Sequence, residues 1–428
     1  MIPESVLWRV LSPLPTLPPL PALPPLPALP DRVDLLVVGA GYTGLAAARA
    51  AAQAGASVLV LEREAVGAGA SSRNGGMVLP GYKAELADVA RRHGLATARA
   101  LWEDSLAAIG FVEALVAEER IACDWHRPGH LTLAAKPAHL RALEASRRQL
   151  ARDFGYETHL VGPADLGAEI GSRCYHGGLV DPGAGALQPA AYLGGLLKAA
   201  QRAGAVVADG IVVRRVVRTP EGLRVETGRG PVRAAEVLVA TNGLTGTLEP
   251  WLARRVVPVG SFIVATAPLA ADVAARLLPR RRMCSDTRNL LYYFRLSADD
   301  RLVFGGRAAF VPTALARSRA LLQQGIREVF PDLGPVAIAH AWGGTLGFTL
   351  DHLPHAGRRE GIGYSLGYGG HGVALASWLG HQAGRALAGA GPWPALASLP
   401  FPAVPLYAGR PWFLPLAGAY YQVKDWLA

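Results

Sequence analysis

The chain has 428 residues, of which 51% are hydrophobic and 18% are charged, a composition that argues against a disordered protein and suits two interleaved domains. Its formal net charge of +10 is spread along the chain, so no nucleic-acid-binding stripe is indicated. The three cysteines lie far apart and outside any C-x-x-C spacing, which argues against a disulfide framework and a zinc site.

Residues 1–30 are expected to form a proline-rich N-terminal arm. Within it, residues 11–30 contain nine prolines and a tandem repeat of Leu-Pro-Pro-Leu-Pro-Ala at 17–22 and 23–28. Such a segment is typical of extended polyproline II. It favours a stiff arm across the protein surface and leaves open weak docking into a partner's aromatic groove. The prolines and the lack of a small-residue cleavage site argue against a signal peptide.

A strand, a turn, a helix and a second strand are predicted directly after the arm. The apolar run 34–38 is typical of a buried parallel strand, and the alanine-rich run 45–53 predicts a helix that ends at Gly55. Residues 57–62 form the next apolar strand. These elements make a compact βαβ unit, which is the usual setting of a dinucleotide site.

The turn of this unit has the glycine spacing of a dinucleotide-binding loop. Gly39 permits the reversal of the chain, Gly41 lets the backbone approach a diphosphate, and Gly44 lets the helix pack closely on the strand. The N–H groups and the dipole of the helix N-terminus would offset the charge of the diphosphate. Glu62, at the end of the second strand, can bind ribose hydroxyls, which favours FAD or NAD over NADP.

A polar, glycine-rich loop at 67–76 distinguishes between FAD and NAD. Its sequence is Gly-Ala-Gly-Ala-Ser-Ser-Arg-Asn-Gly-Gly, which is suited to wrap an extended diphosphate and reach an isoalloxazine ring. A nicotinamide enzyme rarely needs such a loop. The sequence therefore predicts FAD.

Helical and strand patterns then alternate along the chain. Helices are expected over 84–117, 136–154 and 189–202, and strands at 130–134, around 206, 212 and 225, and at 236–240. Alternating strands at 256–267, 290–296 and 301–304 predict an antiparallel sheet.

These elements predict an α/β fold. It consists of a Rossmann-like FAD-binding domain with a parallel sheet and an interleaved α+β substrate-binding domain with the antiparallel sheet. The first domain is expected to comprise residues 31–82, 165–250 and 335–428, and the second residues 83–164 and 251–334.

Two long stretches without charged residues, 361–384 and 386–409, raise the question of a membrane span. The first contains eight glycines and two histidines, and the second contains five prolines, so neither predicts a continuous apolar helix. We expect a cytoplasmic protein without a transmembrane segment. The aromatic tail around Trp412, Tyr420 and Tyr421 is expected to be a helix packed against the FAD-binding domain.

Short motifs spread over nearly the whole chain resemble one enzyme family. After the glycine turn they are Ala70-Ser-Ser-Arg-Asn-Gly-Gly76, Leu187-Gln-Pro189, Ala240-Thr-Asn-Gly243, Ala341-Trp-Gly-Gly-Thr-Leu-Gly347, Asp351-His-Leu-Pro354 and Gly367-Tyr-Gly-Gly-His-Gly-Val373. In this order they resemble the FAD-dependent oxidoreductases of the D-amino-acid oxidase type, and among these they look most like the gamma-glutamylputrescine oxidoreductases.

The resemblance implies which residues lie along the cofactor. Val213 is expected to contact adenine through its backbone, and residues 370–373 to meet the flavin at a helix N-terminus that would stabilise the anionic reduced ring. Without a histidine or cysteine in the loop 67–76, FAD binding is expected to be non-covalent. The expected cofactor-binding residues are Gly39, Gly41, Tyr42, Thr43, Gly44, Glu62, Arg63, Ala70, Ser71, Arg73, Asn74, Gly75, Gly76, Val213, Thr241, Asn242, Gly343, Gly370, His371, Gly372 and Val373.

Five residues are candidates for contact with the substrate or the reacting part of the flavin: His371, Arg73, Tyr293, Arg295 and Trp342. Strand alternation places Tyr293 and Arg295 on one face and Tyr292 on the other, and ordinary packing is the alternative for each of them. Arg73 would support the flavin or grip a substrate carboxylate. His371 would act chemically or only by its position.

A metal site is not expected. His352 and His355 have an i, i+3 spacing, but no third ligand is evident and Pro354 interrupts any helix between them.

The resemblance implies oxidation of a primary or secondary amine or an amino acid. Hydride would pass from the carbon next to nitrogen to flavin N5, and the resulting imine would hydrolyse. The amine, the oligomeric state and the electron acceptor, O2 or another, stay open. Two alternatives are a flavin monooxygenase or reductase that uses NAD(P)H, for which a second glycine fingerprint is missing, and a non-catalytic FAD-binding subunit, for which the proline-rich arm is the only support.

Overall fold

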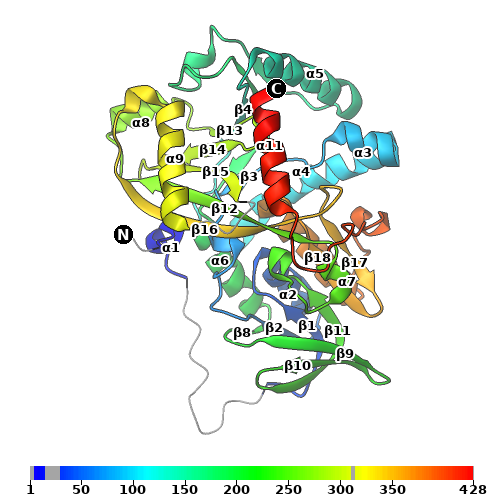
Figure 1. Cartoon of the computed structure of the whole chain (residues 1–428). Coiled ribbons are helices and arrows are strands. Elements are labelled where there is room, and N and C mark those ends of the chain that lie inside the picture. The colour runs from blue at the N-terminus through cyan, green and yellow to red at the C-terminus, as the bar shows by residue number, and fades with distance from the viewer. Residues whose placement is uncertain (1–3, 15–28, 310–313, 428) are drawn as a thin grey trace.

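The structure, a computed structural model, describes residues 4–14, 29–309 and 314–427 and arranges them around two large sheets (Figure 1). The first sheet has the strand order β17-β18-β11-β1-β2-β8, with β10 and β9 attached beside β11. The second has the order β16-β12-β15-β14-β13-β4-β6-β5. Because consecutive segments of the chain alternate between the sheets, the two halves of the molecule are interleaved.

The first sheet has a parallel centre. It contains β1 (Arg32–Val38), β2 (Val58–Leu61), β8 (Val206–Ala208), β11 (Gly230–Val239) and β18 (Ile362–Leu366) in parallel, with β17 (His355–Arg359), β9 (Val213–Thr219) and β10 (Gly222–Thr227) antiparallel to their neighbours. Val38 lies opposite both Leu61 and Val239, so the carboxyl ends of β1, β2 and β11 lie at one edge. Their apolar side chains are buried on both faces, as expected for a covered parallel sheet.

Helices cover one face of this sheet. Of these, α2 (Tyr42–Gln53) and α10 (Gly372–Leu387) lie directly on the sheet. Outside them, α6 (Pro189–Arg202) packs against α2, α4 (Leu95–Glu118) packs against α10, and α3 (Leu86–His93) packs against α4. Two glycines of α10 allow it to approach α2 closely: a Cβ atom on Gly380 would lie 2.3 Å from the carbonyl oxygen of Thr43, and one on Gly384 would lie 2.2 Å from that of Ala47. This contact packs α2 and α10 tightly against each other.

The second sheet is antiparallel except between β13 and β4. Its strands are β16 (Ile338–Phe348), β12 (Val257–Thr266), β15 (Leu302–Ala309), β14 (Tyr292–Leu296), β13 (Met283–Asp286), β4 (His130–Leu133), β6 (Gly178–Asp181) and β5 (His159–Val161). Helix α9 (Leu315–Val329) packs on it over Phe294 and Phe304, and Phe330, which directly follows the helix, joins the same core. The remaining elements are α5 (Pro137–Phe154), α7 (Pro250–Ala253), α8 (Ala271–Leu277), the pair β3 (Met77–Val78) and β7 (Gly185–Ala186), and the short helices η1 (Ala70–Ser72), η2 (Leu166–Ala168), η3 (Asn242–Leu244), η4 (Pro331–Leu333) and η5 (Ala395–Ser398).

The predicted fold class is confirmed, with a parallel sheet and a separate antiparallel one. Two strands belong to a different sheet from the one that the expected domain boundaries imply. β6 and β16 belong to the second sheet, although residues 165–250 and 335–428 were assigned to the FAD-binding domain. β16 pairs with β12 from Phe348 opposite Val257 to Ile338 opposite Thr266, and its glycines hide the alternation that marks a strand. The rest of the domain division stays a prediction.

The expectation of a surface arm is wrong for the first part of the N-terminal segment. Helix α1 (Leu7–Leu11) is packed into the protein, with Leu7 and Trp8 at most 1% exposed. Ser5 forms a bridge to Ala341 on β16. The apolar side chains before the prolines are part of the core here. The whole tandem repeat, at 17–28, lies outside the described residues.

The C-terminal helix α11 (Leu414–Leu427) packs on the second sheet's side of the molecule, not on the FAD-binding side as expected (Figure 1). The carboxylate of Asp425 accepts hydrogen bonds from the backbone N–H groups of Asn289 and Leu290, at 2.7 and 2.9 Å. These polar contacts between distant segments leave no signal in the sequence pattern. Across the described residues, no helix combines the length and apolar character that a bilayer crossing requires.

Candidate active site

The carboxyl edge of the parallel sheet brings together four loops that the sequence singled out. Gly39 follows β1, Glu62 follows β2, Thr241 follows β11 and Gly367 follows β18. The loops are hydrogen-bonded to one another: Gly39 N–H donates to the carbonyl of Leu61 at 2.8 Å, and Gly367 N–H donates to Oδ1 of Asn242 at 2.9 Å. Ligands of open α/β sheets bind at such an edge.

The glycine turn is shaped by close backbone contacts. Gly39 has a φ angle of 105°, which a residue with a side chain rarely adopts, and a Cβ atom on Gly44 would lie 1.9 Å from the carbonyl oxygen of Gly39. A Cβ atom on Gly41 would lie 2.9 Å from Oγ of Ser71. The carboxylate of Glu62 accepts a hydrogen bond from Ala40 N–H at 2.9 Å. Only glycine fits these positions without displacement of the backbone or of Ser71.

The other predicted residues of this edge support the turn. Tyr42 contributes its backbone, because its side chain is buried and donates to the carbonyl of Pro189, and its N–H donates to Oγ of Ser71 at 3.1 Å. Thr43 pairs with the hydroxyl of Tyr368 at 2.7 Å, which joins α2 to the turn before α10. Val213 begins β9, two residues after Ile211, whose N–H donates to the carbonyl of Glu62.

A second helix N-terminus lies at the end of β18. Gly369 and Gly370 have φ angles of 55° and 98°, and a Cβ atom on Gly370 would meet open space. Gly372 and Val373 open α10, and His371 is its N-cap residue without a side-chain cap hydrogen bond. The Nδ1 atom of His371 is buried and has no hydrogen-bond partner among the described residues. Burial lowers the pKa of His371 to about 4, and nearby Lys83 acts in the same direction, so the imidazole is neutral near pH 7.

The loop 70–76 is closed by its own polar side chains. Asn74 donates to the carbonyls of Ala70 and Ser71, at 3.2 and 3.1 Å, and its Oδ1 accepts from Gly76 N–H at 2.8 Å. The guanidinium of Arg73 donates to the carbonyls of Ala68 at 2.8 Å and Gly343 at 2.9 Å. Arg73 therefore ties the loop to β16 of the second sheet.

Tyr293, Arg295 and Trp342 contact this loop from the second sheet. Trp342 donates from Nε1 to the carbonyl of Arg73 at 2.9 Å, and Arg295 donates to the carbonyl of Gly76 at 3.2 Å. A Cβ atom on Gly75 would lie 3.3 Å from the ring of Tyr293. Tyr293 and Arg295 thus share a strand face as predicted, while Tyr292 packs on the opposite face against α9. Two residues of the N-terminal segment, Glu4 and Trp8, reach the same loop, and no sequence signal pointed to them.

Burial perturbs two of these side chains. It lowers the pKa of Arg295 to about 10 and raises the pKa of Tyr293 to about 12. The Nε atom of Arg295 is buried without a hydrogen-bond partner within the described part of the chain. Both groups keep their ordinary protonation at pH 7.

An open cavity of about 860 Å³ runs along the loop between the two sheets. Five predicted residues line it, namely Glu62, Arg63, Ala70, Arg73 and Gly343. Among the residues that also line it and were not predicted are Phe262, Thr345, Arg410, Trp412 and Leu414. The described residues of its walls do not include Tyr293, Arg295 or Trp342, so the substrate contacts expected for these three stay a prediction.

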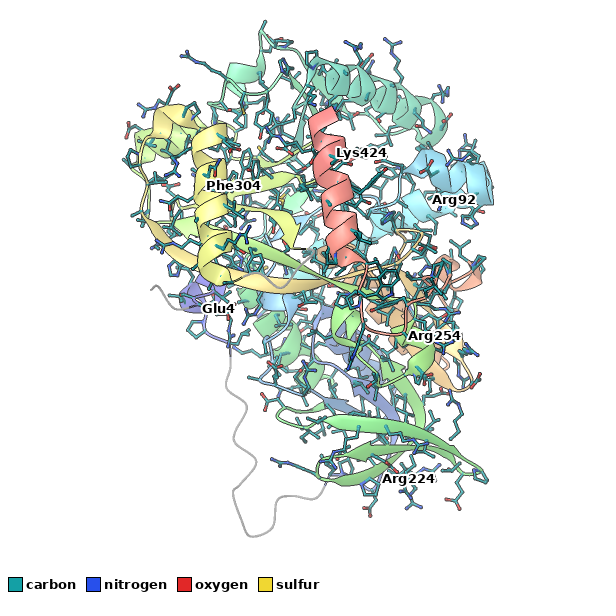
Figure 2. The ribbon with its side chains drawn as sticks, in the orientation of Figure 1. Glu4, Arg92, Arg224, Arg254, Phe304 and Lys424 are labelled. Atoms are coloured by element: carbon teal, nitrogen blue, oxygen red, sulfur yellow. The ribbon has the colours of Figure 1, made fainter. Side chains whose placement is uncertain are left out.

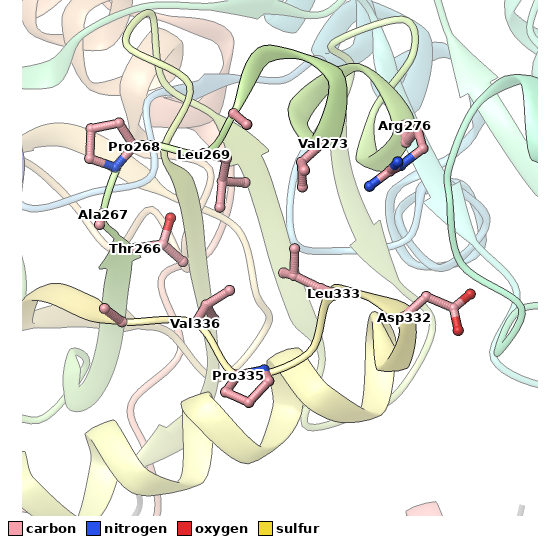
Figure 3. Close-up of a pocket in the computed structure, with 12 residues that line it drawn as sticks. Thr266, Ala267, Pro268, Leu269, Val273, Arg276, Asp332, Leu333, Pro335 and Val336 are labelled. Atoms are coloured by element: carbon pink, nitrogen blue, oxygen red, sulfur yellow. The ribbon is translucent and has the colours of Figure 1, made fainter.

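A smaller hollow of about 320 Å³ lies between the end of β12 and the segment after α9 (Figure 3). Leu269, Val273 and Val336 line it, and Arg276 and Asp332 are exposed beside them. It contains none of the predicted site residues.

One histidine of the predicted pair, His355, has structural partners. His355 hydrogen-bonds to the carboxylate of Asp351 at 3.1 Å and stacks on Phe401, with ring centroids 3.8 Å apart. Among the residues that the structure describes, no group of three or more His, Cys, Asp or Glu side chains is arranged to hold a metal ion.

These features together fit an extended flavin dinucleotide. Two helix N-termini, at Tyr42 and Gly372, open from loops at the same sheet edge. Glycines leave space for a ligand at Gly370, and buried polar atoms of His371 and Arg295 lack partners in the described residues. Backbone N–H groups and positive dipole ends are what a diphosphate and an electron-rich ring require.

Comparisons with known proteins agree with this geometry. The family model "FAD dependent oxidoreductase" matches residues 34–385. The chain is 33% identical to gamma-glutamylputrescine oxidoreductase of Escherichia coli, over 92% of each chain, and 34% identical to the probable oxidoreductase OrdL of Haemophilus influenzae, over 84% of each. Among solved structures it is similar to glycine oxidase from Geobacillus kaustophilus, with a TM-score of 0.74, 22% identity and coverage of 88% of this chain and 99% of that one. The resemblance inferred from the short motifs is thereby confirmed.

Proposed function

The chain belongs to the family of FAD-dependent oxidoreductases, and from this we propose that it oxidises a primary or secondary amine or an amino acid, with bound FAD as the oxidant. The observation that carries the proposal is the meeting of the glycine turn, the loop 70–76 and the N-terminus of α10 at one sheet edge. Tyr42 N–H donates to Oγ of Ser71, and Thr43 pairs with Tyr368 just before α10. An open cavity runs along the loop. In this proposal the turn, the loop and the start of α10 hold the cofactor, and the substrate binds where the cavity meets the loop.

The residues of the chain would divide the work of holding FAD. The N–H groups at the start of α2 would bind the diphosphate, Glu62 the ribose, and the loop 70–76 with the start of α10 the ring. FAD supplies a two-electron acceptor at the flavin N5 position. The dipole of α10 would stabilise negative charge on the pyrimidine side of the reduced cofactor, and the neutral imidazole of His371 adds no charge of its own there.

The substrate would lose one C–H and one N–H hydrogen with two electrons and become an imine, which water splits into a carbonyl compound and an amine. The chain must orient the C–H bond and favour the unprotonated amine, which burial in the cavity does by lowering the amine's pKa. Arg410 in the cavity wall offers positive charge for a carboxylate-bearing substrate, such as a gamma-glutamylated amine or an amino acid.

Anaerobic reduction of the purified protein tests this proposal. A panel of polyamines, gamma-glutamylated amines, sarcosine and D-amino acids is added without oxygen, and the visible flavin band is followed. We expect the band to bleach with at least one amine. Bleaching by NADPH and by none of the amines would favour the monooxygenase or reductase instead, and a colourless protein that does not take up FAD would refute the proposal. The electron acceptor and the cytoplasmic location stay predictions.

A further inference from the structure

The backbone carbonyls of the loop 73–76 are held by three side chains from distant parts of the sequence. Trp342 donates to the carbonyl of Arg73 at 2.9 Å, and Arg295 donates to that of Gly76 at 3.2 Å. The carbonyl between them, that of Asn74, accepts the indole N–H of Trp8 at 2.8 Å. Two of the donors come from the second sheet and one from the N-terminal segment, so the loop depends on a residue that precedes the whole FAD-binding fold.

Trp8 is the centre of a small buried cluster. It is 1% exposed, its ring lies edge-on to Trp342 with centroids 6.4 Å apart, and the guanidinium of Arg295 lies 5.2 Å from its ring centroid. Its own carbonyl accepts a hydrogen bond from the side chain of Gln188 at 2.7 Å, just before α6. Trp8 therefore contacts both other loop-holding residues, and its position fixes theirs.

Glu4 holds the same loop from the other side of Arg73. Its carboxylate pairs with Nη1 of Arg73 at 2.7 Å and accepts a hydrogen bond from Gly343 N–H at 3.2 Å. Burial raises the pKa of Glu4, but the hydrogen bonds from Arg73 and Gly343 outweigh burial, so its pKa lies below the ordinary value and the group is ionised at pH 7. Figure 2 shows Glu4 beside α1, where the N-terminal segment meets the second sheet.

The segment is anchored along β16. Ser5 donates its N–H to the carbonyl of Ala341 at 3.1 Å, and its hydroxyl pairs with Nδ1 of His340 at 2.9 Å. β16 is the outer strand of the second sheet and supplies both Trp342 and Gly343 to the loop. The N-terminal segment thus pairs with the edge strand β16, which also carries Trp342 and Gly343.

We propose that residues 4–12 are a working part of the active site, in which Trp8 is a positioning residue that sets the loop 73–76 for the flavin and Glu4 holds Arg73 on that loop. The inference rests on the proposed function, because it takes FAD as the ligand of the loop. It goes beyond that function because the segment lies outside the matched residues 34–385. An unheld carbonyl at Asn74 would leave the loop free to turn away from the ring.

The decisive variant is Trp8→Phe, which keeps an aromatic ring in the core and removes the N–H donor. The matched control is Trp378→Phe, which removes an indole hydrogen bond to Asp104, 2.6 Å long, in the α4–α10 contact. For each protein, FAD is titrated into the apo-protein and flavin fluorescence is followed. The visible spectrum and the reduction potential of the bound flavin are recorded, and kcat and KM are compared with the best amine.

We expect Trp8→Phe to raise the dissociation constant of FAD about tenfold, the size of one well-formed hydrogen bond, and to shift the flavin spectrum and potential. We expect kcat to fall more than KM changes. Trp378→Phe should bind FAD as the unaltered protein does. Equal FAD affinity and equal spectra for Trp8→Phe and the unaltered protein would overturn the inference.

Glu4→Ala and Glu4→Gln are a second pair in case Trp8→Phe does not fold. Alanine removes both acceptor contacts, so FAD binding is expected to weaken about threefold or more, whereas glutamine keeps an acceptor oxygen and should restore part of the affinity. FAD binding unchanged in both variants would refute the role of the segment. If the unaltered protein itself takes up no FAD, the proposed function fails instead, so the two failures are distinct.

Discussion

The glycine turn 39–44 and the loop 70–76 both border the proposed flavin site, but they are built in different ways. The turn is shaped by close contacts at its glycines, such as the 1.9 Å that a Cβ atom on Gly44 would leave to the Gly39 carbonyl. The loop is closed by its own Asn74 and is also held by side chains from distant segments, namely Trp8, Arg295 and Trp342. The turn thus depends mainly on its glycines, and the loop depends in part on residues from elsewhere.

This difference has a consequence for mutations. A change at Gly44 alters the shape of the turn itself, because the clash is with the Gly39 carbonyl. A change at a supporting side chain leaves the loop residues intact and alters only how they are held. The two segments meet where Tyr42 N–H donates to Oγ of Ser71, so a disturbance of either one is expected to reach the same ligand.

The largest effect is expected from Gly44→Ala in the turn. The added Cβ atom would lie 1.9 Å from the Gly39 carbonyl oxygen, so α2 must move away from β1 and its N–H groups move with it. We expect FAD binding to weaken at least about 100-fold, which is about 2.7 kcal/mol, and the purified protein to be colourless. Titration of the apo-protein with FAD, followed by flavin fluorescence, measures this.

Gly110→Ala is the matched control, because Gly110 lies inside α4 and a Cβ atom there meets nothing within 4 Å. Alanine is also the better helix former, so this variant should keep its colour and be slightly more stable. A yellow Gly44→Ala protein with normal FAD affinity would show that the turn does not need its intrinsic shape.

The sequence indicated both the turn and the loop, but not all of the distant side chains that hold the loop. Gly39, Gly41 and Gly44 are read from their own spacing, although only Gly44 meets the backbone of the turn itself. Gly39 faces the carbonyl of Ala240, and Gly41 faces Oγ of Ser71. Trp8 touches Asn74, 66 positions away, and nothing in the pattern around Trp8 marks it as part of a site.

In the second sheet, too, the sequence predicted local features but not long-range contacts. Alternation correctly placed Tyr293 and Arg295 on one face of β14, but not what that face meets, because the partner loop lies in the other half of the fold. β16 was missed as a strand of this sheet because Gly343, Gly344 and Gly347 interrupt its apolar pattern. Pairing with β12, a long-range contact, makes it a strand.

An intermediate effect is expected from Arg295→Met, which changes a support of the loop. The guanidinium is buried, its Nε lacks a partner in the described structure, and the ion pairs of the described residues do not include it. Replacement by an apolar side chain of similar length should leave the stability of the apo-protein unchanged or raise it by about 1 kcal/mol. Loss of the donor to the Gly76 carbonyl should weaken FAD binding about tenfold.

Arg282→Met supplies the opposite case, because Arg282 pairs with Glu169 at 2.7 Å and lies away from the loop. It should lower the free energy of unfolding and leave FAD affinity unchanged. Chemical denaturation of the apo-proteins and FAD titration give both quantities for each variant. If Arg295→Met lowers stability and FAD affinity in equal measure, Arg295 is a general core residue and the contrast between turn and loop loses its support.

The smallest effect is expected from the pH dependence of His371, at the second helix N-terminus. In the folded protein burial lowers its pKa to about 4, with Lys83 and His130 acting in the same direction, while the unfolded chain takes up the proton near the ordinary value of 6.5. Between these values the unfolded state binds more protons, so the free energy of unfolding falls as the pH drops from 6.5 toward 4. From pH 7 to 5.5 this amounts to about 1 kcal/mol for one histidine.

His371→Gln removes this contribution without removing the polar side chain. Denaturation of the apo-protein at pH 7 and pH 5.5 should therefore show a drop in stability that is about 1 kcal/mol smaller for the variant than for the unaltered protein. His159→Gln, at an exposed position of β5, is the control and should leave the drop unchanged. Equal drops for His371→Gln and the unaltered protein would mean that His371 takes up its proton in the folded state. In that case a positive charge would stand at the start of α10, and this helix N-terminus would owe its attraction for an electron-rich ring to the imidazole as well as to its backbone.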